Sequence, residues 1–139
     1  MRGELEAVYS MLTSLPDDGT RERVLRKIAD PSTHFATRVW LNDDQDGCLT
    51  LTAAAAARQM TPRAYLKKYG TNVGEALGLT RTQIGTAIAA WSDASSAEQE
   101  TFLCKIRAYI QRTYVPTGCV PPRRPQDIEC LAVVDPVPA

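Results

Sequence analysis

Four polar residues that suit contact with base edges occur within six positions of this sequence. They are Arg81, Thr82, Gln83 and Thr86, and Thr80 precedes them. Arginine can bind guanine, glutamine can pair with adenine, and the methyl group of threonine can contact thymine. If Thr80 caps a helix over 80–91, the four side chains lie near the end of that helix, where backbone N–H groups also attract a phosphate. The pattern therefore predicts a helix that reads bases.

Basic residues precede this segment and could hold a nucleic-acid backbone. They are Arg58, Arg63, Lys67 and Lys68. The whole chain carries 16 basic and 16 acidic residues, so its net charge of zero favours no partner. The two halves differ, however, because residues 1–57 have a net charge of −3 (6 − 9) and residues 58–139 one of +3 (10 − 7). We expect these four cations and Thr80 to contact phosphates.

The residues from 72 to 91 have the spacing of a helix-turn-helix, with helices over 72–77 and 80–91. Gly78 lies where the turn requires a positive φ, and Gly74 or Ala76 is small enough for the point at which the helices touch. Apolar residues at the positions that would pin the second helix to the first are Leu77, Leu79, Ile84 and Ile88. In this arrangement the four polar residues face outward.

The segment 63–91 resembles the helix-turn-helix of phage Cro-type repressors. The run from Ala76 to Arg81, together with Ala87, Ile88 and Trp91, is also similar to the plasmid regulator KorA of the TrfB family. In those families the second helix enters the major groove and a dimer binds a near-palindromic operator. The resemblance implies double-stranded DNA and a second copy of the chain as partners. It also implies that the four polar residues after Thr80 are the base readers.

A weaker helix–turn–helix cadence covers 51–66 and is similar to that of excisionase-type proteins. Gln59 stands where the turn glycine would be expected. We therefore favour 72–91, with Arg63 and Tyr65 in a supporting role.

The periodicity predicts a mainly α protein, a small helical domain with a short β-hairpin and a proline-rich C-terminal arm. Leu5, Val8, Leu12 and Leu15 recur at helical spacing, and a second helix is expected over 20–29. Alternating residues over 33–52, around the turn-forming stretch 42–47, predict the hairpin. Further helices are expected from Thr52, over 61–69 and after the Ser95–Glu98 capping box. We divide the chain at 1–50, 51–114 and 115–139, with one edge strand over 131–134.

Two sets of residues could bind a metal on ligand type alone, and neither site is favoured. Asn42, Asp44, Asp46 and Gly47 fit an EF-hand loop, but Ala53 stands where the bidentate glutamate belongs, so a solvated acidic turn is preferred. Cys104, Cys119, Cys130 and the single histidine, His34, are zinc-ligand types, but no CxxC spacing supports a site. We expect no metal and no cofactor.

Catalytic and membrane functions find no support in the sequence. No nucleophile motif, phosphate loop or HExxH motif is present, so we do not expect an enzyme. No apolar run approaches the roughly 20 residues that span a bilayer, and the start has no signal-peptide core, so we expect a cytoplasmic protein.

The favoured function is a sequence-specific transcriptional regulator, a repressor of phage or plasmid type. The alternative is a small phage-encoded protein that inhibits a host machine through protein contacts, anti-CRISPR-like or polymerase-binding. The acidic first half of the chain favours this alternative.

Overall fold

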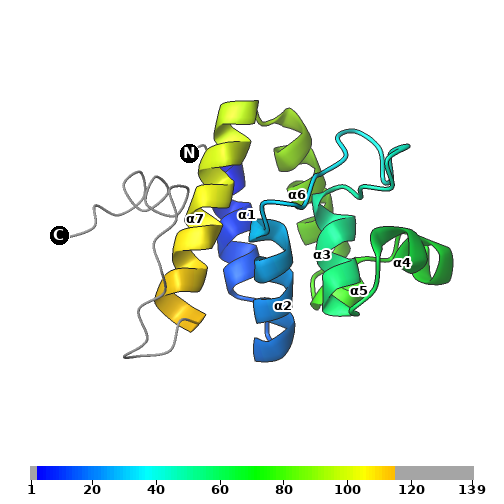
Figure 1. Cartoon of the computed structure of the whole chain (residues 1–139), viewed down its shortest axis with the longest axis horizontal. Coiled ribbons are helices and arrows are strands. Elements are labelled where there is room, and N and C mark those ends of the chain that lie inside the picture. Colours follow the sequence, from blue (N-terminus) through cyan, green and yellow to red (C-terminus); the bar gives the residue numbers. More distant parts are fainter. Residues whose placement is uncertain (1–2, 115–139) are drawn as a thin grey trace.

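A computed structural model describes residues 3–114, and the expected mainly helical class is confirmed there (Figure 1). None of the helices in this range is long and apolar enough to cross a membrane. The proline-rich arm expected over 115–139, with its edge strand, lies outside the described residues. The described helices are α1 (Gly3–Thr13), α2 (Asp18–Ala29), α3 (Leu49–Ala57), α4 (Pro62–Tyr69), α5 (Gly74–Leu77), α6 (Arg81–Asp93) and α7 (Ser96–Tyr114).

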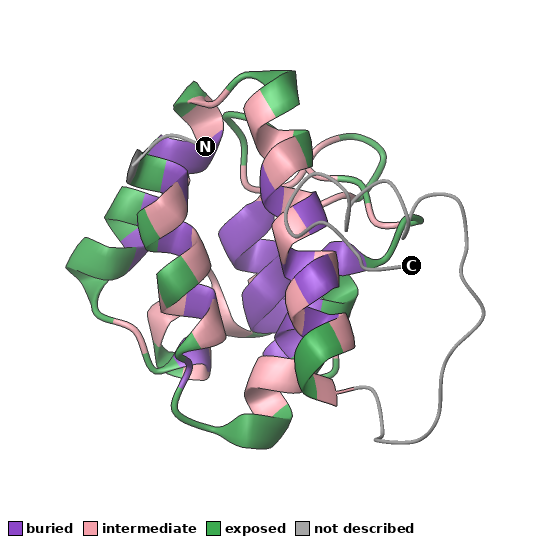
Figure 2. Cartoon of the chain, turned by 90° about the vertical axis from the view of Figure 1, so that its left-hand side faces the viewer, coloured by how far each residue is buried: buried purple, intermediate pink, exposed green. Residues whose placement is uncertain are grey.

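Helix α3 is the centre of the packing. It contacts α2, α4, α5 and α6, and every one of its residues except Ala56 is buried. Its run of alanines makes this possible, because side chains of one methyl group let four neighbours approach a single helix. Figure 2 shows the buried residues on the inner sides of the helices, with a nearly wholly buried helix in the middle. The helices that carry the candidate site are therefore held by a common support.

A cluster of aromatic residues joins α6 to α7 and to the segment after α2. The Trp91 ring lies 5.4 Å from that of Phe35 and 5.6 Å from that of Phe102, and both pairs have an edge-to-face geometry. Helix α1 packs against α6 and α7, and α2 packs against α7. Trp91 is thus a core anchor, and it fixes the C-terminal end of α6.

The helices begin where capping residues occur in the sequence. Thr61 accepts a hydrogen bond from the Ala64 N–H, and Ser95 and Glu98 form the expected capping box of α7. Asp17 caps α2 by accepting from the Thr20 N–H, and this bond lowers the pKa of the Asp17 carboxyl. Local sequence therefore decides these boundaries.

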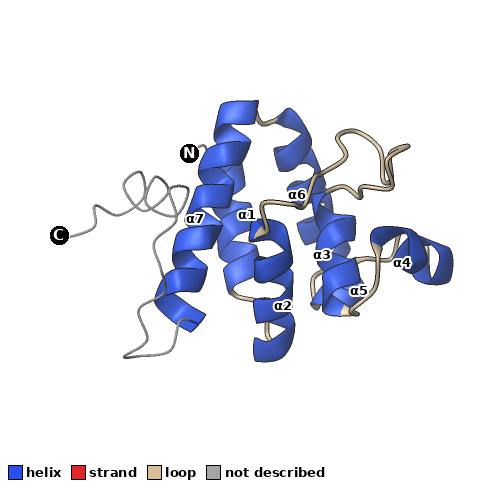
Figure 3. Ribbon diagram, viewed as in Figure 1, coloured by secondary structure: helices blue, strands red, loops and turns tan. Residues whose placement is uncertain are grey.

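The prediction of a β-hairpin over 33–52 is wrong. Between residues 33 and 48 the structure has one isolated antiparallel bridge, Leu41 with Gly47, and residues 49–52 are the first turn of α3 (Figure 3). The alternation of leucine and threonine misled because all four of these residues are buried on a helix that is covered on all sides. The turn itself is real, since Asn42 Oδ1 accepts from the N–H groups of Asp44 and Asp46.

Candidate nucleic-acid interface

Helix α6 is held from one side and exposed on the other. Its buried residues are Ile84, Ala87, Ala90 and Trp91. The four residues predicted to read bases, Arg81, Thr82, Gln83 and Thr86, are all exposed, and so is Gly85 between them. A Cβ built on Gly85 would meet nothing within 4 Å. The N-terminal half of α6 thus presents polar side chains from a rigidly packed helix.

Hydrogen bonds at the start of α6 already engage the side chains of two predicted base readers, Gln83 and Thr86. Thr80 Oγ accepts from the Gln83 N–H at 3.1 Å, and Gln83 Oε1 accepts from the Thr80 N–H at 2.9 Å, which is a complete capping box. Thr86 Oγ donates to the Thr82 carbonyl at 3.0 Å. Gln83 therefore has a structural role that we missed, although a threonine followed three positions later by glutamine is a known signal. Its amide nitrogen remains the group that can donate to a base.

The connection from α5 to α6 depends on two glycines, Gly74 at the start of α5 and Gly78 at its C-cap. Gly78 ends α5 with φ 74°, in the left-handed region, as predicted. Helix α5 has only four residues, so it is shorter than the helix expected over 72–77. A Cβ on Gly74 would lie 2.6 Å from the Leu79 carbonyl oxygen and 3.4 Å from Ile84 Cγ1. Gly74 is therefore the small residue that this close approach requires.

Gly74→Ala is expected to destabilise the fold by about 1–2 kcal/mol, because the new methyl group collides with backbone that cannot move freely. The matched control is Gly85→Ala on the exposed face of α6. It should stabilise the fold by roughly 0.5–1 kcal/mol, since alanine is the better helix former and has free space. Urea unfolding of both variants measures the difference. Equal effects would contradict the close approach at Gly74.

The four predicted phosphate-contacting cations are all exposed at the end of α3 and on α4. Two of them, Arg58 and Lys68, lie over the ring of Tyr69, with the guanidinium carbon 5.1 Å and the ammonium nitrogen 5.4 Å from the ring centre. These cation–π contacts limit where the two charges can lie. The sequence analysis did not assign this role to Tyr69. The other two cations, Arg63 and Lys67, also lie on α4.

Tyr65 supports this cationic surface from below. Its ring is 4.8 Å from that of Tyr69, and its hydroxyl donates to the Asn72 carbonyl at 2.6 Å. Burial raises the pKa of the Tyr65 hydroxyl, which keeps it protonated as a donor. These two contacts give Tyr65 the means to play the supporting role that the sequence predicts for it. Three of the cations lie on α4 and Arg58 lies at the end of α3, whereas the base readers lie on α6; helix α3 contacts both α4 and α6.

The connection from α3 to α4, which belongs to the second and weaker helix–turn–helix cadence, has a left-handed residue at the position where a glycine was expected. Gln59 has φ 57°, the left-handed conformation for which glycine was expected. Helices α3 and α4 therefore are joined through such a turn without a glycine. Arg63 stands in the first turn of α4, directly after this connection.

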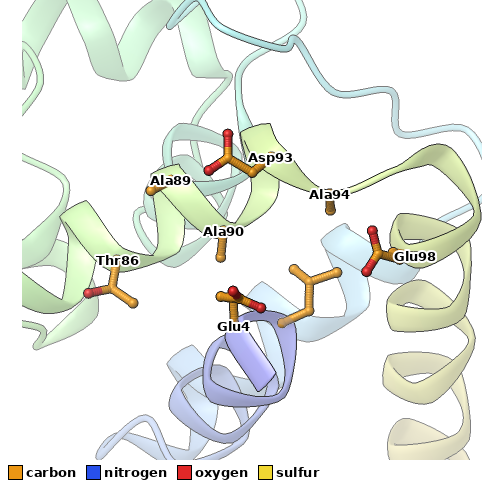
Figure 4. A pocket seen from close by; sticks show the side chains of 8 residues that line it. Glu4, Thr86, Ala89, Ala90, Asp93, Ala94 and Glu98 are labelled. Carbon is orange, nitrogen blue, oxygen red and sulfur yellow. The ribbon is translucent and has the colours of Figure 1, made fainter. Parts of the chain in front are cut away.

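An acidic cleft lies beside the exposed face of α6 (Figure 4). It has a volume of about 440 Å³, and Thr86, Ala89 and Ala90 form its α6 side. Glu4, Asp93 and Glu98 also line it, from α1, the end of α6 and α7. The negative charges of these carboxylates would repel a phosphate backbone near the C-terminal half of α6. Sequence reasoning missed this cleft because Glu4 is far from α6 along the chain.

Within residues 3–114, no group of three or more histidine, cysteine, aspartate or glutamate side chains is placed to hold a metal. Two residues of the zinc-ligand type, Cys119 and Cys130, lie outside that range. Comparison with known proteins adds no family: no family description, curated protein or solved structure matches the chain. The case for the candidate interface therefore rests on the geometry and chemistry of its own residues.

Proposed function

We propose that this protein is a sequence-specific double-stranded DNA-binding regulator of transcription, a repressor of the phage or plasmid type. In this proposal α5 and α6 with their turn are a helix-turn-helix, and α6 is the reading helix. The observation that carries the proposal is the one-sided burial of α6. Its apolar side is packed on the core while Arg81, Thr82, Gln83 and Thr86 remain exposed near its N-terminus.

Contacts would divide between the two helices according to their chemistry. The N-terminal half of α6 would enter the major groove, where Arg81 reads guanine and the amide nitrogen of Gln83 donates to a base acceptor. Arg58, Arg63, Lys67 and Lys68 would contact phosphates and fix the register of the protein on the duplex. The carboxylates at the other end of α6 would keep the helix from lying along the groove over its full length.

A dimer follows from the size of the reading surface. Four side chains on half a helix read only a few base pairs, so a second copy would double the site. Two copies related by a twofold axis would recognise an inverted repeat with half-sites about 34 Å apart, one turn of the duplex.

Selection from a pool of random duplexes tests this function. The full chain is expected to enrich an inverted repeat whose half-sites are centred about 10 base pairs apart, and to shift that duplex in a gel. Binding should weaken steeply as salt rises, because cations on α3 and α4 release counterions from phosphates. If the folded protein shifts no duplex even at low salt, the proposal is wrong.

The acidic cleft favours one second candidate, an inhibitor that binds a host protein. Carboxylates around an alanine-lined floor would suit a basic segment of a protein partner and repel DNA. In that case Thr86 and Ala89 would contact protein, and the cations of α4 would have no necessary role.

Asp93→Asn separates the two candidates. Asp93 is exposed at the end of α6 and lines the cleft, so its loss should leave the fold intact. For a DNA regulator the change should tighten binding to every duplex by about two- to five-fold, because one like charge is removed. For an inhibitor it should instead weaken retention of the basic partner. Gel shifts over a range of salt concentrations measure the first effect, and Asp43→Asn on the distant exposed turn is the control.

A further inference from the structure

The outer side of α7 is buried over part of its length, although α1 and α2 pack on its other side. Figure 1 shows α7 at the edge of the helical bundle. Phe102 and Ile106 face inward and belong to the hydrophobic core. Cys104 and Ala108 each follow one of them by two positions, which on an α-helix is about 200° around the axis, so they face outward. Even so, Cys104 is only 9% exposed and Ala108 only 1%, and neither belongs to the core cluster.

Exposure along the same side of α7 limits the buried patch to the part around Cys104 and Ala108. Ala97 precedes Cys104 by two turns on this side, and it is exposed. Arg112 lies one turn beyond Ala108 and is also exposed. The neighbouring side chains of one helix cannot by themselves enclose an alanine, because they diverge from the helix axis. Atoms from another part of the chain must therefore cover this patch.

The bonding of Cys104 indicates which part of the chain supplies the cover. Cys104 is bonded in a disulfide. Cys48, the other cysteine among residues 3–114, is free. The sequence has two more cysteines, Cys119 and Cys130, and both follow the end of α7. A bond within one chain leaves these two as the partners available to Cys104.

The chain after α7 is long enough to reach the patch. Helix α7 ends at Tyr114, ten residues after Cys104 and therefore roughly 15 Å from it along the axis. Cys119 follows five residues later, a length that spans at most about 18 Å when extended, and the longer stretch to Cys130 can span more than about 50 Å. A segment that returns along α7 from Tyr114 passes Ala108 before it reaches Cys104. One segment can therefore cover both residues.

We propose that the outer side of α7 is a docking site for the chain's own C-terminal segment, residues 115–139. A disulfide from Cys104 to Cys119 or Cys130 tethers the segment, and apolar contact with Ala108 adds a non-covalent part. The inference does not depend on DNA binding, because α7 carries none of the predicted base readers or phosphate contacts.

The tether forms by thiol–disulfide exchange with a small-molecule disulfide, of which oxidised glutathione is the probe. One protein thiolate attacks a glutathione sulfur and displaces one glutathione thiolate, which leaves a mixed disulfide. The second protein thiolate attacks the protein sulfur of that bond and displaces the other glutathione. Two protein thiols are thus oxidised to one disulfide, one glutathione disulfide is reduced to two thiols, and the two thiol protons pass to the released glutathione. The tether is therefore present only where such an oxidant is supplied.

A peptide map of the full-length protein tests the pairing. The reduced chain is equilibrated with oxidised glutathione, its remaining thiols are alkylated, and it is digested with trypsin without reduction. Trypsin cuts after lysine and arginine, and such residues separate all four cysteines into different peptides. We expect the peptide with Cys104 to be linked to the one with Cys119 or Cys130, in a chain that migrates as a monomer. Cys48 should be recovered alkylated.

Ala108→Glu tests the docking, with Ala97→Glu as its matched control. The same substitution is made twice on one side of α7, once in the buried patch and once at an exposed position. A buried carboxylate without a partner opposes docking, so Ala108→Glu should lower the equilibrium constant for closing the disulfide at least about ten-fold. Ala97→Glu should change it by less than about two-fold. The fraction of linked Cys104 across a series of glutathione redox ratios measures both constants.

Three results would overturn the proposal. One is Cys104 bonded to Cys48 or to a second copy of the chain, the latter seen as a dimer that reduction separates. Another is Cys104 recovered alkylated throughout the glutathione series. The third is an equal effect of the two glutamate substitutions, which would mean that nothing docks over Ala108. The peptide map uses the unaltered sequence, so its result does not depend on how the variants fold.

Discussion

Phe102→Ala is expected to lower the free energy of unfolding by about 3–5 kcal/mol, the largest stability loss that we predict. Phe102 has no exposed surface, and its ring lies 5.6 Å from that of Trp91. Removing the ring leaves a cavity where α6 meets α7 and also deprives Trp91 of an edge contact. A domain of this size has about 5–15 kcal/mol of stability in total, so the midpoint of urea unfolding should fall markedly.

The exposed Val39 provides the control for this prediction. Its side chain is 51% accessible, so Val39→Ala should change the free energy of unfolding by no more than about 0.5 kcal/mol. A loss below about 1 kcal/mol for Phe102→Ala would mean that α6 and α7 do not share a packed interface. In that event the C-terminal end of α6 would not be fixed as described.

Helix boundaries were predictable wherever a cap determines them locally. Thr61 before Pro62 and Thr80 before Arg81 begin α4 and α6 at the expected residues, because a hydroxyl satisfies a free N–H group one turn later. Such a signal needs only four consecutive residues. Gly78 in the turn after α5 was predictable for the same reason, because the turn requires a positive φ there, whereas the sequence left the small residue of the helix contact open between Gly74 and Ala76.

The stretch before α3 shows where local pattern fails. Leu49 and Leu51 alternate with threonines, and alternation is a strand signal for a surface element with one buried face. Helix α3 has no exposed face, because α2, α4, α5 and α6 all pack on it. Its periodicity therefore carries no information about its conformation, and only the alanines that follow indicate a helix.

The candidate interface likewise has some features that the local sequence predicts and others that depend on tertiary packing. Exposure of the readers on α6 could be expected from the spacing of Ile84 and the apolar residues around it. The placement of Arg58 and Lys68 over the ring of Tyr69 could not, since it depends on how α3 ends and α4 returns. The approach of Glu4 to α6 likewise depends on tertiary packing between α1 and α6.

Arg81→Ala is expected to remove most of the preference for one base pair while leaving the fold unchanged. Arg81 is the first residue of α6 and is exposed, and the Thr80–Gln83 capping box does not involve its side chain. A bidentate contact from arginine to guanine contributes about 1–3 kcal/mol of discrimination, which corresponds to about a 5- to 150-fold change in relative affinity. Competition between the selected duplex and one with that base pair changed measures the loss.

Lys67→Ala is the matched control, because a phosphate contact carries no sequence information. It should weaken selected and random duplexes alike and reduce the slope of log affinity against log salt by about one. Gln83→Glu adds a second comparison, since the carboxylate can still accept from the Thr80 N–H but cannot donate to a base. If Arg81→Ala and Lys67→Ala have the same effect on every duplex, α6 contacts only the backbone and the reading surface lies elsewhere.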